Sequence, residues 1–188
     1  MVSRNLRTEH RFVCLTDQSL RGVETINVQP YPRLKAWWNK VRLFDPALGL
    51  RGRIVYLDLD VLVVGDLLPV AEFPAPLALI PTAGRHVPTD EVKKVVRRYN
   101  SSVMVWDAGT RPEIYQRWTP KVAGRLWGDQ DWIGELCPDE ARMPLEWFPR
   151  LSETPAACPP PPARVVLAKK PKNHVAATTT TWVRRVWT

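Results

Sequence analysis

The chain has 188 residues, of which 45% are hydrophobic and 24% charged, and this ordinary globular composition excludes wholesale disorder and predicts a single domain. The 27 Lys and Arg residues outnumber the 19 Asp and Glu residues, and the net charge of +8 favours anionic partners such as nucleotides without naming one. Three widely spaced cysteines, three histidines without metal-ligand spacing and no long apolar run exclude a disulfide framework, a zinc site and a membrane span. No signal-peptide pattern opens the chain, so we expect a soluble cytoplasmic protein.

Apolar, β-branched runs alternate along the chain with segments of helical spacing. Strands are predicted at 11–15, 24–28, 53–64, 77–80, 102–106 and 164–167, and helices at 37–44, 90–98 and 128–136. Buried strands that alternate with helices favour an α/β sheet covered on both faces. The region 159–188 holds a proline run, the last predicted strand and a basic, threonine-rich tail.

The strand predicted at 53–64 is apolar except for two aspartates, Asp58 and Asp60. Residues two apart on a strand share a face, so both carboxylates are expected side by side at the end of a central strand, facing a cleft. Two close carboxylates stay ionised together only with a compensating cation or hydrogen-bond donors, and Mg²⁺ and Mn²⁺ prefer carboxylate oxygens. The alternative is that the strand ends near Asp58 and that the carboxylates are solvated at a turn.

Seven segments occur in order over nearly the whole chain: HRFVCLTD, WWNKVRLFDP, RIVYLDLDVLVVGDL, YNSSVMVW, GDQDWI, VVLAKKPK and WVRRVW. This series resembles the GT-A-fold nucleotide-sugar glycosyltransferases, in particular bacterial and phage relatives of glycosyltransferase family 8. The resemblance implies a GT-A-like α/β fold, with a mixed central sheet flanked by helices, in one domain over 1–188. It also implies transfer of a sugar from a nucleotide-diphosphate sugar to an acceptor hydroxyl, assisted by Mn²⁺ or Mg²⁺.

The same resemblance implies roles for three groups of polar residues: the metal ligands, the residues that bind the donor, and the catalytic residues that contact the donor sugar near its reacting carbon. The metal ligands are Asp58 and Asp60, and the catalytic residues are Asp129, Gln130 and Asp131. The residues that bind the donor are Lys40, Asn100, Ser101, Ser102, Lys169, Lys170 and Lys172. The three late lysines would meet the diphosphate as positive charges.

Each of these assignments has a purely structural alternative. The Asn-Ser-Ser segment could simply turn the chain into the next strand, and the aspartates of the Asp-Gln-Asp segment could favour the dipole of the helix that begins there. Lys40 could lie on a solvated helix face. Trp37 and Trp38 are expected to pack in the core or in a lid rather than to form a platform for a sugar.

Two features depart from the family pattern. The family opens with a strand and a nucleotide-binding loop, and this chain is expected to begin inside the helix that follows them. The family's closing histidine, a metal ligand, is replaced by Ala168, and His174 is poorly spaced to substitute for it. We therefore expect a metal to bind only when a nucleotide diphosphate supplies further oxygens.

These departures keep two other functions open. The chain could be a degenerate, non-catalytic protein that binds nucleotide sugars, or nucleic acid through its basic tail. We expect the tail's tryptophans to pack on the domain instead, which disfavours nucleic acid and leaves peripheral membrane contact open. A haloacid-dehalogenase-like phosphatase is the third reading, because its first motif is also Asp-x-Asp after an apolar strand, but GDQDW has the wrong spacing for its later motif.

Overall fold

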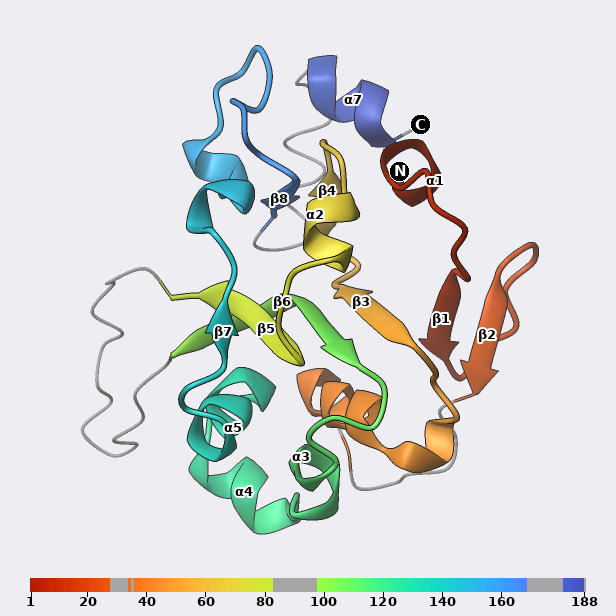
Figure 1. The fold of residues 1–188 in the computed structure, drawn as a ribbon, viewed down its shortest axis with the longest axis vertical. Coiled ribbons are helices and arrows are strands. Elements are labelled where there is room, and N and C mark those ends of the chain that lie inside the picture. Colours follow the sequence, from red (N-terminus) through yellow and green to blue (C-terminus); the bar gives the residue numbers. More distant parts are fainter. Residues whose placement is uncertain (28–33, 35, 83–97, 169–180, 188) are drawn as a thin grey trace.

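The computed structural model places a four-stranded sheet at the centre of the molecule (Figure 1). The described residues are 1–27, 34, 36–82, 98–168 and 181–187. In spatial order the strands of the sheet are β3 (Arg53–Leu57), β6 (Tyr99–Asp107), β5 (Leu77–Pro81) and β7 (Ala141–Arg142). Strands β3 and β5 run antiparallel to β6, whereas β7 runs parallel to β5, so the sheet is mixed, as expected.

Two smaller sheets flank this centre. Strand β1 (Val13–Thr16) pairs in parallel with β2 (Glu24–Asn27), and β4 (Val61–Val63) pairs antiparallel with β8 (Val165–Leu167). Strands β1, β2 and β8 lie where apolar runs predict them, and β4 lies within the longer strand predicted at 53–64.

Short helices make up most of the remaining described structure. They are α1 (Val2–Asn5), η1 (Ala36–Phe44), η2 (Pro46–Leu48), α2 (Leu68–Ala71), α3 (Glu113–Gln116), α4 (Pro120–Arg125), α5 (Asp129–Leu136), η3 (Leu145–Trp147), η4 (Leu151–Glu153) and α7 (Thr181–Trp187). The helices predicted at 37–44 and 128–136 are confirmed as η1, a 3₁₀ helix, and α5. The helix predicted at 90–98 lies outside the described residues. Within the described segments, no helix combines the length and the apolar character that crossing a bilayer requires.

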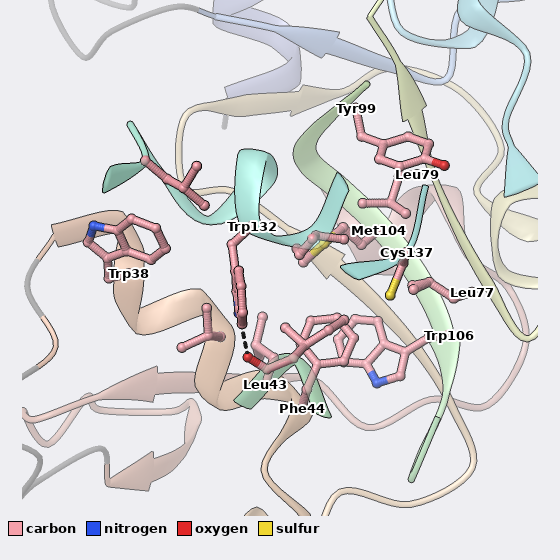
Figure 2. Packing of buried hydrophobic residues seen from close by; sticks show 14 of the residues in the cluster. Trp38, Leu43, Phe44, Leu77, Leu79, Tyr99, Met104, Trp106, Trp132 and Cys137 are labelled. Atoms are coloured by element: carbon pink, nitrogen blue, oxygen red, sulfur yellow. Dashed lines mark hydrogen bonds between the residues drawn. The ribbon is translucent and has the colours of Figure 1, made fainter. Parts of the chain in front are cut away.

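Strands β5 and β6 send alternate side chains into two hydrophobic cores, because successive residues of a strand point to opposite faces. Leu79 and Met104 are register partners and belong to the core shared with η1, α3, α4 and α5 (Figure 2). Ala78 and Val105 are the adjacent pair and belong to the core shared with α2, β4 and β8. The first core packs α5 against η1 and α3. Figure 2 shows a hydrogen bond that joins α5 to α3, in which the Trp132 indole N–H donates to the Ile114 carbonyl at 2.8 Å.

The strand predicted at 53–64 is in fact two strands in different sheets. Strand β3 ends at Leu57, the next residues form a turn, and β4 begins at Val61. The prediction that Asp58 and Asp60 share one face of a central strand is therefore wrong, and β3 lies at the edge of the four-stranded sheet. The reason is the polarity of the segment: two carboxylates cannot be covered inside a sheet, so the chain leaves it and exposes 90% of Leu59. The alternative is right that the strand ends near Asp58, but the Asp58 side chain is only 19% exposed.

The structural alternative for the Asn-Ser-Ser segment, a turn that leads into the next strand, is also wrong. Asn100 and the two serines lie inside β6 rather than at a turn before it, and a register shift between Leu79 and Ile80 marks the same stretch on β5. The serine backbone pairs with the chain beside it, since the Asp58 amide donates to the Ser102 carbonyl at 2.9 Å.

Candidate functional site

The ammonium group of Lys40 lies at a junction of three other segments. From η1, its Nζ contacts the carboxylate of Asp58 at 2.9 Å (Oδ1) and 3.0 Å (Oδ2). It donates to Ser101 at 3.2 Å (Oγ) and 3.4 Å (backbone O), and it lies 3.8 Å from Oδ2 of Asp129. Lys40 is therefore no solvated surface lysine: it joins the end of β3, the strand β6 and the start of α5.

Tyr56 is a member of this site that the sequence interpretation missed. Its hydroxyl donates to Oδ1 of Asp58 at 2.7 Å, and its ring centroid lies 5.5 Å from Nζ of Lys40. Burial, followed by the charge of Asp58, raises the pKa of the Tyr56 phenol, so the group stays a neutral donor. The signal was available, because Tyr56 and Asp58 are two residues apart within the strand predicted at 53–64 and would share a face there. We call Lys40, Tyr56, Asp58, Ser101 and Asp129 the Lys40 cluster.

Asp129 begins α5 and is only 3% exposed. Burial raises the pKa of its carboxyl group, and the charge of Lys40 and a hydrogen bond from Ser101 oppose that shift. Its Oδ2 is buried and accepts no hydrogen bond within the described residues. An acid that merely favours the helix dipole is ordinarily at the surface. Asp129 is instead a buried carboxylate that faces a cation.

The remaining predicted residues differ in where they lie. Asp131 lies two residues after Asp129 in α5 and is also buried, and Gln130 between them is partly exposed. Asn100 bonds its own strand, with Oδ1 accepting from the Ser102 amide at 2.8 Å. Lys169, Lys170, Lys172 and His174 lie outside the described residues. Their roles stay predictions.

Asp60 lies beside the position at which the family pattern expects a histidine. The pairing of β4 with β8 brings Ala168 there, and its amide donates to the Asp60 carbonyl at 3.2 Å. Over the described ranges, no group of three or more His, Cys, Asp or Glu side chains could hold a metal ion. Carboxylates suit a hard divalent cation, but Asp58 and Asp60 supply two protein ligands at most, and Asp58 already pairs with Lys40.

Comparisons with known proteins address the fold. No protein-family model matches the chain, and no curated protein gives a significant sequence match. The solved structure of galactosyltransferase LgtC, in complex with donor and acceptor sugar analogues, has a TM-score of 0.61 and 14% identity, covering 89% of this chain and 76% of LgtC. The chain has the GT-A fold.

A second GT-A neighbour agrees. The apo-form glycosyltransferase GlyE of Streptococcus pneumoniae TIGR4 has a TM-score of 0.50 and 17% identity over 68% of this chain and 32% of GlyE. The resemblance expected from the ordered segments is thus confirmed at the level of fold, and neither neighbour supports the phosphatase alternative.

In this GT-A chain the two tryptophans that precede the cluster have opposite environments. Trp38 is buried in the core, as expected. Trp37 is 55% exposed, so it does not pack in the core, which was one of the two kinds of packing expected for the pair. Its indole N–H donates to the Trp127 carbonyl at 2.8 Å, which places the ring against the start of α5.

Proposed function

We propose that the chain is a glycosyltransferase that moves a sugar from a nucleotide-diphosphate sugar to an acceptor hydroxyl. The observation that supports this most directly is the Lys40 cluster. A cation held at the junction of three segments, with a buried carboxylate facing it, suits a ligand that carries both a diphosphate and a sugar. The GT-A fold and its glycosyltransferase neighbours support the same class of reaction.

The reaction needs positive charge where the leaving diphosphate develops negative charge. In this proposal Lys40 contacts the donor, and Lys169, Lys170 and Lys172 contact the diphosphate. Asp58 and Asp60 would hold Mn²⁺ or Mg²⁺, which would supply further positive charge at the leaving group.

The sugar end of the donor would meet α5 and β6. Asp129, Gln130 and Asp131 orient the donor sugar in this proposal, while Asn100, Ser101 and Ser102 line its pocket. Burial of Asp129 suits this task, because a charged group shielded from water acts more strongly on a ligand than a solvated one.

The partners in this proposal are a nucleotide-sugar donor and a hydroxyl acceptor. LgtC was solved with analogues of both kinds of sugar, and we extend that pairing to this chain. A cytoplasmic location is part of the proposal, because all three cysteines, Cys14, Cys137 and Cys158, are free thiols that suit a reducing compartment.

The test is release of nucleoside diphosphate from a panel of UDP- and GDP-sugars with Mn²⁺. We expect the wild type to release it from at least one donor, and Lys40→Met to lower the rate by about a hundredfold or more, the effect of losing one preorganised charge. Lys121→Met is the matched control, because Lys121 is an exposed lysine on α4, and its rate should equal that of the wild type. No release from any donor, or equal rates for both variants, would refute the proposal.

One observation favours a second candidate, a degenerate protein that binds nucleotide sugars without turning them over. The buried apolar Ala168 adjoins Asp60, where the family pattern has a metal ligand. Calorimetric binding of UDP without any release from UDP-sugars would identify this candidate.

A further inference from the structure

Three exposed apolar residues are close in sequence to members of the Lys40 cluster. Large hydrophobic residues are exposed at six positions in the described segments: Phe12, Leu20, Trp37, Leu59, Trp127 and Leu145. Trp37 precedes Lys40 by three residues, Trp127 precedes Asp129 by two, and Leu59 follows Asp58 directly. Half of the exposed apolar residues therefore adjoin members of one charged cluster, and apolar surface beside convergent polar groups is typical of ligand-binding sites.

Trp37 is exposed but held in place. Its indole N–H is bonded to the Trp127 carbonyl at 2.8 Å. Its ring also lies so close to Gly128 that a Cβ atom there would come within 3.0 Å of ring atoms Cδ1 and Nε1. A large aromatic ring that is fixed on one side and 55% exposed presents a rigid apolar face to solvent.

We infer that Trp37, held against Gly128 by its bond to the Trp127 carbonyl, is a stacking site for the apolar face of an acceptor sugar ring. The C–H groups on one face of a pyranose carry partial positive charge, and they suit the negative face of an indole. A nucleobase would also need partners for its polar edges, but the Trp37 N–H is already bonded. The site adjoins Gly128 and Asp129, and in the proposed function Asp129 contacts the donor sugar at its reacting carbon. The acceptor must approach that carbon, so the inference rests on the proposed function.

The test is saturation-transfer NMR with methyl β-galactoside, methyl β-glucoside, methyl α-mannoside and UDP as separate probes. We expect at least one glycoside to receive saturation mainly at the protons of one ring face. Trp37→Ala should weaken its binding by about tenfold, a usual size for one aromatic contact. Trp37→Phe keeps an aromatic face and should retain most of the binding. Phe12→Ala removes an equally exposed (55%) aromatic outside the cluster and should bind like the wild type.

The outcomes separate the stacking site from the proposed function. Unchanged glycoside binding in Trp37→Ala, or no glycoside signal in the wild type, would overturn the inference. So would a loss of contacts to the base of UDP in Trp37→Ala with glycoside binding retained, which would make the site a base platform. Glycoside stacking on a wild type that releases no nucleoside diphosphate would refute the proposed function and leave the stacking site standing. If Trp37→Ala fails to fold, Trp37→Leu, which keeps an apolar side chain but removes the aromatic face, gives the same comparison.

Discussion

The two carboxylates nearest Lys40 are compensated to different extents. Asp58 receives the ammonium group at 2.9 Å and a tyrosine hydroxyl at 2.7 Å. Asp129 is more buried, yet its distance from the same ammonium group is 3.8 Å. At that separation the attraction to the ammonium group offsets less of the desolvation free energy of a buried carboxylate. The uncompensated cost of burial is therefore larger for Asp129 than for Asp58.

This difference predicts a pH dependence of stability. The pKa of Asp129 is raised in the folded protein, so its ionisation opposes folding, and stability should fall as the pH rises above 3.8, the ordinary value. Asp129→Asn removes the charge while keeping the shape. We expect urea unfolding at pH 4, 5, 6 and 7 to show a growing advantage of Asp129→Asn over the wild type. A stability difference that is constant with pH would contradict the raised pKa.

At the scale of elements, the cluster depends on how two helices meet. Gly128 precedes α5 in extended backbone and lets the ring of Trp37, on η1, lie directly against it. The missing Cβ atom thus permits the close approach of η1 and α5 that brings Lys40 toward Asp129.

Two glycine substitutions should therefore have opposite signs. Gly128→Ala would place a methyl group 3.0 Å from the Trp37 ring, and we expect it to lower the free energy of unfolding by about 1 kcal/mol. Gly124→Ala, within α4, meets no atom within 4 Å and should raise the free energy of unfolding by about 0.5–1 kcal/mol. Urea denaturation of both variants measures the two effects. An equal or larger gain in Gly128→Ala would show that the contact with Trp37 is loose.

The pairing of β4 with β8 carries a second prediction at this scale, because it brings residue 168 beside Asp60. Ala168→His offers an imidazole to any metal held by Asp58 and Asp60. We expect calorimetry to detect little Mn²⁺ binding by the wild type without UDP, appreciable binding with UDP, and binding about tenfold tighter in Ala168→His with UDP. Ala168→Leu fills similar space without a ligand atom and should show no gain. Tight Mn²⁺ binding by the wild type alone would reveal another ligand.

At the scale of the whole molecule, the described ends of the chain are tied together. Figure 1 shows α1 beside α7, and the Arg4 guanidinium donates to the carbonyls of Val186 at 2.6 Å and Arg185 at 3.4 Å. Trp182 and Val183 of α7 pack on the strand pair β4 and β8. The expectation that the tail packs on the domain as a helix therefore holds for Trp182.

Arg4→Ala should loosen α7 without unfolding the core. We expect the global free energy of unfolding to change by less than about 0.5 kcal/mol, as for most surface substitutions. Amide hydrogen exchange should nevertheless accelerate in α7 while β6 stays protected. Arg7→Ala, at an exposed arginine just beyond α1, is the control and should leave exchange in α7 unchanged. Equal exchange in both variants would mean that the packing of Trp182 alone holds the helix.

The sequence by itself determined the local elements and, through the order of its segments, the fold. Apolar runs predicted β1, β2, β5 and β8, and helical spacing predicted η1 and α5, because burial on one face imposes a period that is visible locally. The Asp-x-Asp, Asn-Ser-Ser and Asp-Gln-Asp segments were also visible as polar interruptions of apolar surroundings. These are properties of neighbouring residues.

Only the tertiary structure decided which of these residues meet. Period-two spacing cannot tell a strand that continues from one that ends, so the break after Leu57 was only an alternative to a continuous strand. Exposure of Trp37 and burial of Trp38 depend on which side of η1 faces the hydrophobic core. The partnership of Lys40 with Tyr56 and Asp58 depends on how η1 packs against β3. Burial and charge pairing join residues far apart in the chain, and local pattern carries no record of those distances.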